Sequence, residues 1–250
     1  MTVPPRGRVA PMMRSLLAVS LCVAGSGMAA PRAQNEKPRL RSGQVAGAAA
    51  AAVFAATTLD VTTLHVVSPG LDALARGAAC AASECGRSND IGRALSDVGP
   101  GLGAPCVAAA AFGTATRGRR FLVRTVAPLL AGYGVAVQGF AHVVKDATAR
   151  VRPDQLHHAS FSFPSLHTAT AVYLAGALLC VLAPALLAEE GDDGPTWRWR
   201  PVEVGAVAAA GGLTALGRVL TESHWLSDTV GGAALGVAAL GLVAFARDEA

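Results

Sequence analysis

Long uncharged apolar runs, separated by short polar loops, dominate the pattern of this chain. Three of the runs reach about 20 residues, the length at which a helix crosses a bilayer core, whereas 204–217 is short and rich in glycine. No run sustains the alternation typical of strands, so the pattern predicts an all-α bundle of five to six packed helices. The apolar runs cover residues 42–59, 98–116, 125–144, 166–188, 204–217 and 229–246.

Residues 60–97 have a different pattern, in which apolar and charged positions are mixed. This mixture predicts one or two amphipathic surface helices. Cys80 and Cys85 lie in this segment and could pair in an oxidising compartment. They could equally be two unpaired thiols on an alanine-rich helix, and the sequence leaves both readings open.

The charged residues between the apolar runs indicate which ends of the helices would face the cytoplasm. The segment RGRRFLVR (117–124) carries four arginines, which favours a cytoplasmic loop. The run 125–144 would then start inside, and Lys145 would emerge on the outer side. Tracing the chain backwards places the start of 42–59 inside as well.

The N-terminal part of the chain favours a different topology. Residues 1–29 have the basic start, apolar stretch and small-residue end of a signal peptide, or they form an N-terminal anchor. Residues 30–43 read as a polar linker. A cleaved signal would leave that linker outside, so a soluble secreted or periplasmic helical domain is the alternative. We expect a bacterial-type inner-membrane protein whose polar loops around Lys145 face the periplasm or cell exterior.

Composition narrows the range of partners. The chain is 52% hydrophobic, 15% charged and 5% aromatic, with a formal net charge of +4. Its basic residues do not form blocks and few aromatic side chains are available for stacking, so we expect no nucleic-acid partner. Only Lys37 and Lys145 are lysines, which makes the position of Lys145 informative.

The first loop with candidate chemistry is KDATARVRP, residues 145–153. On one continuous helix Lys145 and Arg152 would lie two turns apart on the same face, and Pro153 would end that helix. The alternative is a pair of cations that only marks the membrane boundary.

The second loop, PSLH, opens the apolar run 166–188. Ser165 supplies a hydroxyl, His167 lies in the first turn, and the amides of a helix N-terminus favour an anion. The alternative is a capping serine followed by an incidental histidine.

The third loop is GRVLTESHWLSD, residues 217–228. Arg218 adds a cation, and His224 and Asp228 are four residues apart, so on a helix they share a face. A carboxylate on one imidazole nitrogen leaves the other free to attack. The alternative is a structural hydrogen bond.

Taken together, the three loops predict a site for a phosphate-like anion. An alternating bundle brings the ends of these runs to one side, where three cations would surround helix-terminal amides. Two histidines can act there as nucleophile and general acid. The loops hold no carboxylate cluster with the spacing of metal ligands, so we expect no metal and no other cofactor.

These motifs resemble the signature of the type 2 phosphatidic acid phosphatase superfamily, which includes lipid phosphatases, class A acid phosphatases and vanadium haloperoxidases. The signature is K-x6-RP, then PSGH, then SR-x5-H-x3-D, and its order and spacing fit residues 145–153, 164–167 and 217–228. The resemblance covers a motif core of 98–246 within a domain at 44–250.

The resemblance implies a role for each matching position. His224 would be the nucleophile that forms a phosphohistidine, Asp228 would orient it, and His167 would protonate the leaving oxygen and later activate water. The transition-state oxygens would be held by Lys145, Arg152, Ser165, the amide of Leu166, and Arg218.

Two positions depart from the signature. Leu166 stands where the family has glycine, and a positive φ there would cost a leucine about 1 kcal/mol or more. Gly217 stands where the family has serine.

We therefore expect a metal-independent phosphatase acting on a phosphate or diphosphate ester, with a membrane lipid as its substrate. A soluble periplasmic acid phosphatase is the alternative enzyme, a vanadate-dependent peroxidase is less expected, and Leu166 leaves room for an impaired lipid-phosphate binding protein. The sequence does not name the lipid, and it leaves the oligomeric state open.

Overall fold

A computed structural model describes the protein over most of its length. The segment 1–29, with its predicted signal peptide or anchor, and the predicted linker up to residue 41 lie outside the described residues. The residues described are 42–82, 85–86, 89–155, 159–188 and 200–248.

Every regular element among the described residues is helical, which confirms the predicted all-α class. Backbone groups inside a bilayer must find partners within their own segment, and long uncharged runs satisfy this need as helices. Several helices pass without a break into turns wound as π-helix (η). In chain order the elements are α2 (Ser42–Leu59), η2 (Asp60–Leu64), α3 (Ser68–Ala82), α4 (Asp90–Ser96), α5 (Val98–Gly101), α6 (Gly103–Phe121), η3 (Leu122–Val126), α7 (Ala127–Ala131), η4 (Gly132–Gly139), α8 (Phe140–Thr148), α9 (Leu166–Gly176), η5 (Ala177–Leu182), α10 (Ala183–Leu187), α11 (Pro201–Leu220) and α12 (Leu226–Asp248).

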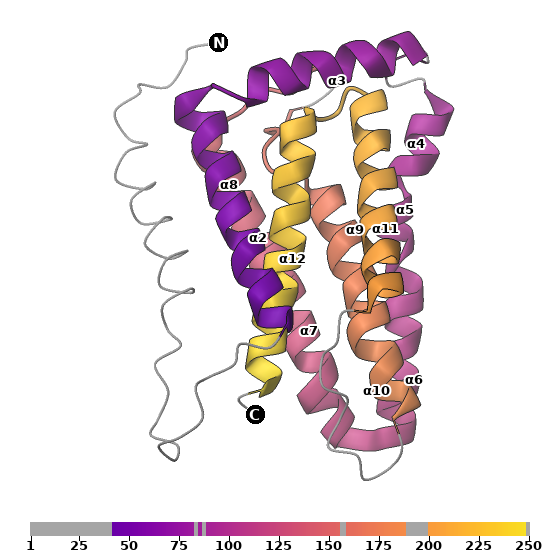
Figure 1. Ribbon diagram of the computed structural model, residues 1–250. Coiled ribbons are helices and arrows are strands. Elements are labelled where there is room, and N and C mark those ends of the chain that lie inside the picture. The colour runs from indigo at the N-terminus through magenta and orange to yellow at the C-terminus, as the bar shows by residue number, and fades with distance from the viewer. Residues whose placement is uncertain (1–41, 83–84, 87–88, 156–158, 189–199, 249–250) are drawn as a thin grey trace, which may run out of the picture. The chain divides into compact units, whose positions relative to one another are not determined.

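Within the described residues, five helical stretches are long and apolar enough to cross a membrane. One of them, Val98–Thr148, is 51 residues long and folds back on itself at Gly118. Gly118 has φ 73° and ψ −158°, a conformation that glycine adopts without the steric cost of a side chain. Its two arms run in opposite directions, α6 toward the turn and α7 away from it (Figure 1).

One predicted run is longer than the sequence suggested. Residues 204–217 were expected to form a short segment, whereas α11 has 20 residues and starts at Pro201. Because Glu203 is charged, the uncharged run in the sequence begins only after it. The side chain of Glu203 accepts hydrogen bonds from Arg200 Nε at 2.8 Å and from the Arg200 backbone N–H at 3.1 Å, which neutralises the charge at the first turn.

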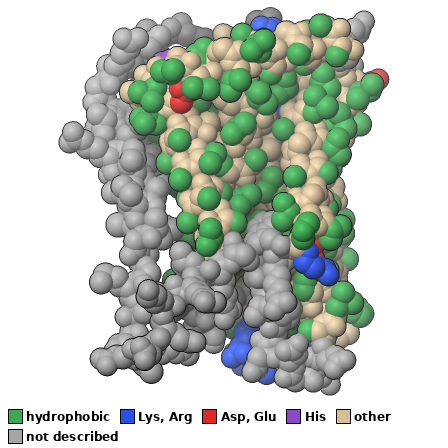
Figure 2. Space-filling model, in the orientation of Figure 1, with side chains coloured by type: hydrophobic (Ala, Val, Ile, Leu, Met, Phe, Trp, Pro, Cys, Tyr) green, Lys and Arg blue, Asp and Glu red, His purple; other side chains and the backbone are tan. Residues whose placement is uncertain are grey.

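The bundle has two ends of different character. At one end lie the end of α8, the start of α9, the end of α11 and the start of α12, and α3 runs across this end (Figure 1). The arginine-rich turn around Gly118 lies at the opposite end, where α2 also begins (Figure 1). On the face seen in Figure 2, hydrophobic side chains cover the helices and the few charged ones lie toward the two ends.

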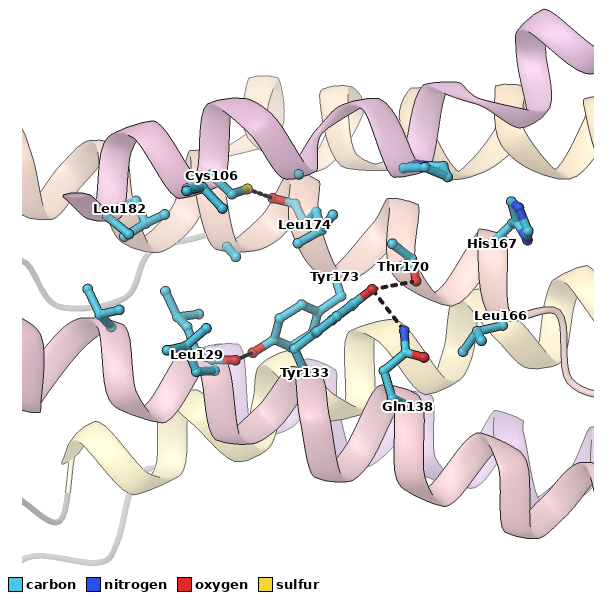
Figure 3. Close-up of a pocket in the computed structure, with 17 residues that line it drawn as sticks. Cys106, Leu129, Tyr133, Gln138, Leu166, His167, Thr170, Tyr173, Leu174 and Leu182 are labelled. Carbon is cyan, nitrogen blue, oxygen red and sulfur yellow. Dashed lines mark hydrogen bonds between the residues drawn. The ribbon is translucent and has the colours of Figure 1, made fainter. Parts of the chain in front are cut away.

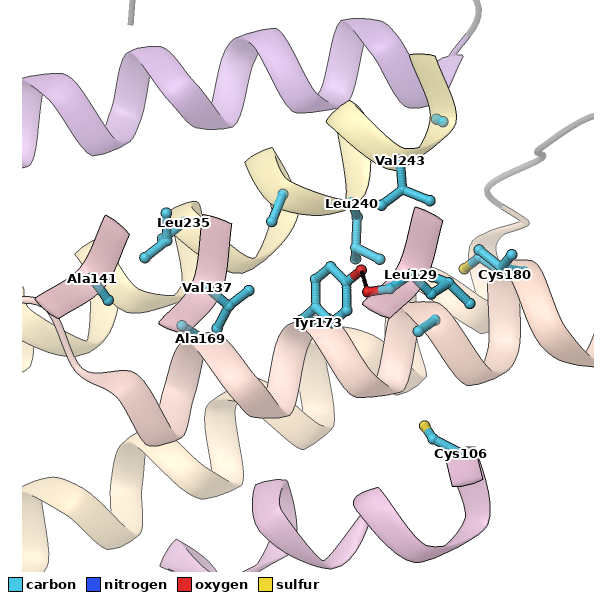
Figure 4. Packing of buried hydrophobic residues seen from close by; sticks show 14 of the residues in the cluster. Cys106, Leu129, Val137, Ala141, Ala169, Tyr173, Cys180, Leu235, Leu240 and Val243 are labelled. Carbon is cyan, nitrogen blue, oxygen red and sulfur yellow. Dashed lines mark hydrogen bonds between the residues drawn. The ribbon is translucent and has the colours of Figure 1, made fainter. Parts of the chain in front are cut away.

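α12 forms the centre of the packing, in contact with α2 on one side and α9 on the other. The core between α9, α7, η4 and α12 is filled by Tyr173, Val137 and Leu240, which are almost completely buried (Figure 4). The hydroxyl of Tyr173 donates to the carbonyl of Leu129 at 2.7 Å. Such packing holds the ends of α9 and α12 in fixed positions.

The segment 60–97 contains the π-helix η2 and two α-helices, α3 and α4, where one or two surface helices were predicted. Cys80 and Cys85 form a disulfide, which decides the question that the sequence left open. α4 packs tightly on α11, where the backbone of α4 reaches Gly217. The disulfide and both helices lie on the same half of the bundle as the polar loops (Figure 1).

Candidate active site

The first predicted cluster lies where the chain leaves α8. Ala149 takes a left-handed conformation (φ 47°, ψ 31°), and its N–H donates to the carbonyl of Lys145, so α8 ends at Thr148. The expectation that one helix carries both Lys145 and Arg152 and ends at Pro153 is therefore wrong. Lys145 lies on α8 and Arg152 lies in the loop beyond it.

Lys145 and Arg152 nevertheless donate hydrogen bonds to the same stretch of backbone, residues 160–162. Lys145 Nζ donates to the carbonyls of Phe161 at 3.0 Å and Ser162 at 3.1 Å. Arg152 Nε donates to the carbonyl of Ser160 at 2.9 Å. Burial lowers the pKa of Arg152, and a nearby carboxylate opposes this effect. Both side chains are buried, so the two charges face the interior of the loop cluster rather than bulk water.

The start of α9 leaves its amides open. The first helical hydrogen bond joins Ala169 N–H to the carbonyl of Ser165, so the amides of Leu166, His167 and Thr168 have no partner in an earlier turn. Ser165 Oγ does not cap the helix; it lies 3.1 Å from Thr168 Oγ1. The reading of Ser165 as a simple capping residue is therefore not supported. These open amides, at the positive end of the helix dipole, favour an anion.

The cations converge on His167. The charges of Arg218, Arg152 and Lys145 act on the half-buried His167 ring, and the Asp97 carboxylate opposes them. Arg218 Nε is buried and has no hydrogen-bond partner among the described residues. A buried guanidinium N–H without a partner is costly unless an anion completes the site.

His224 lies in the turn between α11 and α12. Its backbone N–H donates to the carbonyl of Arg218 at 3.2 Å, which joins it to the end of α11. α12 begins only at Leu226, because Glu222 turns the chain with φ 51°. The expectation that His224 and Asp228 share one helix is therefore wrong, although the turn still brings the two side chains together.

The environment of the His224 ring fixes its tautomer. Its Nε2 lies 3.1 Å from a terminal nitrogen of Arg152, and a guanidinium can only donate, so Nε2 is the acceptor. The ring proton is then on Nδ1, which lies 3.4 Å from Asp228 Oδ2, longer than a well-formed hydrogen bond. Burial lowers the pKa of His224 to about 3; Asp228 raises it, whereas Arg218 and Arg152 lower it further. His224 is thus neutral, with its Nε2 lone pair facing the cations.

All of the predicted site residues therefore lie around one end of the bundle. Their arrangement offers open amides, three cations and a neutral imidazole to a tetrahedral anion. Among the described residues, no group of three or more histidine, cysteine, aspartate or glutamate side chains could hold a metal ion. The predicted residues are Lys145, Arg152, Ser165, Leu166, His167, Arg218, His224 and Asp228.

Comparison with known proteins decides the family. The sequence model of the PAP2 superfamily matches residues 127–249, which include every residue of the predicted site. The chain belongs to the PAP2 superfamily. A solved structure of a transmembrane PAP2-type phosphatidylglycerolphosphate phosphatase from Bacillus subtilis has 20% identity and a TM-score of 0.39 over 95% of this chain and 96% of its own. No curated protein matches the sequence.

A groove of about 510 Å³ extends from the site of this PAP2 protein along the bundle. His167 and Leu166 line one end of the groove, and Leu129 and Leu182 line the other (Figure 3). Most of its wall is apolar and comes from α6, α7 and α9. The sequence indicated apolar helices but not the space between them.

The wall of the groove carries one polar cluster, which sequence reasoning missed. Gln138 Nε2 donates to the hydroxyl of Tyr133 at 2.8 Å, and that hydroxyl lies 3.4 Å from Thr170 Oγ1 (Figure 3). Thr170 is one turn from His167, on the same side of α9. These polar groups therefore lie beside the path from the site into the groove.

Sequence reasoning also missed the partners of Asp228. Arg150 donates to Asp228 Oδ1 at 2.5 Å, and Ser162 donates its hydroxyl to Asp228 Oδ2. Asp72, on α3, contacts Arg150 at 2.6 Å. The one available signal was a further arginine between Lys145 and Arg152; nothing in the sequence pointed to Asp72.

Proposed function

We propose that this PAP2 protein is a metal-independent phosphatase that hydrolyses a phosphate or diphosphate ester of a membrane lipid. The observation that carries the lipid assignment is the apolar groove that starts at His167. Val107 and Leu130, which line it, are 69% and 65% exposed, so the groove opens sideways where the helices would face lipid. An acyl or prenyl chain could enter there without crossing water.

The site residues then have distinct roles in the proposed reaction. The neutral Nε2 of His224 attacks phosphorus, and the bond from phosphorus to the leaving oxygen breaks as His167 supplies a proton to that oxygen. Asp228 stabilises the positive charge that develops on His224. Water, activated by His167, then attacks the phosphohistidine and releases phosphate.

The cradle of cations and amides stabilises the transition state. Its donors are fixed before substrate binds, because Lys145 and Arg152 are held by loop carbonyls and the amides belong to α9. Leu166 belongs to α9 and is not among the residues with positive φ, so its amide is available without backbone strain. This geometry supports an active enzyme rather than an impaired binding protein.

The two ends of the bundle support an orientation with the site outside the cytoplasm. The arginine-rich turn 117–124 favours the cytoplasmic side at one end. The disulfide of Cys80 with Cys85 lies toward the other end and favours an oxidising compartment there. Two independent features therefore point to the same orientation.

A substrate panel with a groove variant tests the proposal. The full-length protein in detergent, with EDTA present, should release phosphate from dioctanoyl phosphatidic acid, phosphatidylglycerophosphate or undecaprenyl diphosphate, and vanadate should inhibit it. Ala110 lines the groove, so Ala110→Phe should lower kcat/KM for dioctanoyl phosphatidic acid. Displacing two methylene groups costs about 1.6 kcal/mol, or about fifteenfold.

A control variant and a control substrate accompany this test. Ala108 is exposed on the same helix and is not part of the groove wall, so Ala108→Phe should leave kcat/KM for the lipid unchanged. Ala110→Phe should spare p-nitrophenyl phosphate, which needs no groove. Equal losses on both substrates would contradict the lipid assignment, and activity lost in EDTA and restored by magnesium would contradict the metal-free mechanism.

A further inference from the structure

Arg150 bridges two buried carboxylates behind the proposed nucleophile. One terminal nitrogen donates to Asp228 Oδ1 at 2.5 Å and to Ser227 Oγ at 2.6 Å, and the other donates to Asp72 Oδ2 at 2.6 Å. The guanidinium also lies over the ring of Trp225, 5.8 Å from its centroid. Such a two-sided contact fixes the guanidinium plane.

Asp72 is anchored independently of Arg150. It lies on α3 and is only 4% exposed. The backbone N–H of Ser227 donates to its Oδ1 at 2.8 Å, and the hydroxyl of Ser227 donates to its Oδ2 at 2.8 Å. Asp72 therefore joins α3 to the first turn of α12, next to Asp228.

These contacts divide the two oxygens of Asp228 between two tasks. Oδ1 faces Arg150, whereas Oδ2 accepts from the N–H of Trp225 at 2.9 Å and from the Ser162 hydroxyl, and faces His224 Nδ1. Rotation of the carboxylate would break the contacts on both sides at once. The orientation of Oδ2 toward His224 is thus secured by contacts to both oxygens.

We propose that Arg150 and Asp72 are positioning residues: Arg150 holds the Asp228 carboxylate toward His224 and offsets part of its negative charge, and Asp72 holds Arg150 in place. The inference rests on the proposed phosphatase function and deepens it. Arg150 acts through Asp228, and Asp72 acts through Arg150 and Ser227.

The charge balance around His224 predicts how the pair affects catalysis. Asp228 from α12 favours the protonated ring, whereas Arg218 from α11 and Arg152 from the loop favour the neutral one. Removing Arg150 would leave Asp228 and Asp72 as two buried carboxylates without the cation between them. His224 would then take up a proton at a higher pH and lose the lone pair with which it attacks.

The test measures kcat, KM and the pH profile of kcat/KM for the full-length protein with dioctanoyl phosphatidic acid. Arg150→Gln should lower kcat about tenfold or more with little change in KM, since it acts on the transition state. Its acid limb should move up by about one pH unit, the usual effect of removing one nearby charge. Arg150→Lys keeps the charge but not the two-sided contact, so its acid limb should stay in place while kcat falls.

A double variant and a control on α3 complete the design. Asp72→Asn combined with Arg150→Gln should be no worse than Arg150→Gln alone, because the two residues act through one contact. Arg76 lies one turn from Asp72 and pairs with Glu222, so Arg76→Gln removes a cation from the same helix without touching Asp228. Arg76→Gln should keep the wild-type acid limb.

The possible outcomes separate this inference from the function on which it rests. A wild-type acid limb in Arg150→Gln would overturn the inference, whether activity stays high or falls together with thermal stability. An equal shift in Arg150→Lys would overturn it as well, because the charge is then not what matters. A wild-type protein that turns over none of the phosphate esters would overturn the proposed function and this inference with it.

Discussion

Gly217→Ala should destabilise the protein, although alanine favours a helix over glycine. A Cβ atom at position 217 would lie 2.4 Å from Ser96 N, 2.6 Å from the Gly92 carbonyl oxygen and 2.8 Å from the Leu95 carbonyl carbon. All three atoms belong to the backbone of α4, which cannot move aside as a side chain can. Such overpacking costs about 1–3 kcal/mol.

A second glycine on α11 provides a control that separates the steric cost from the gain in helix propensity. Gly212 has no atom within 4 Å of the place of its Cβ, so Gly212→Ala should gain only helix propensity, about 1 kcal/mol. That gain is common to both variants and cancels between them. The unfolding midpoint in one detergent should therefore be lower for Gly217→Ala by about 2–4 °C for each kcal/mol of overpacking. Equal midpoints would refute the close approach of α4, and Gly217→Ser should behave like Gly217→Ala despite restoring the family residue.

Three further predictions address the site and the topology. Leu166→Gly should not raise kcat/KM, because Leu166 already has helical φ and its side chain packs against the core; a tenfold gain would show that leucine strains the loop. His224 stays neutral when folded down to a pH of about 3 but takes up a proton near 6.5 when unfolded, so the free energy of unfolding should fall by up to about 1.4 kcal/mol per unit as the pH drops through this window. His224→Gln should remove this component of the slope in thermal unfolding against pH, and an unchanged slope would refute the burial of a neutral ring. With Cys22, Cys106 and Cys180 replaced, an impermeant thiol reagent on intact cells should label Gln155→Cys but not Thr116→Cys, and the reverse pattern would invert the topology.

Much of the fold could be predicted because apolar length and loop charge are local properties of the chain. The alternation of uncharged runs with polar loops predicted the helices and the end of the bundle at which the loops meet. The length of α11 was underestimated because Glu203 reads as a charge in the sequence, whereas in the structure Arg200 neutralises it. The pairing of Cys80 with Cys85 depended on their Cα atoms lying 4.9 Å apart, which composition does not specify.

The members of the site could be proposed from spacing, but not its supports. His224 and Asp228 come together through a turn that places Glu222 at positive φ, not through one helix as expected. Arg150 reaches Asp228 from 78 positions away along the chain, and Asp72 reaches Arg150 from another 78 positions away, and no local pattern signals such contacts. The groove beside His167 likewise depends on how helices far apart in sequence pack.

The central claim is that His224 carries the phosphoryl group during turnover. The most direct measurement is acid-free rapid quenching of the full-length protein with ³²P-labelled dioctanoyl phosphatidic acid in EDTA, followed by peptide mapping. The proposed mechanism predicts an alkali-stable, acid-labile label on His224 that is absent from His224→Ala and forms as fast as the lipid is turned over. Turnover without a labelled histidine, or turnover retained in His224→Ala, would contradict it.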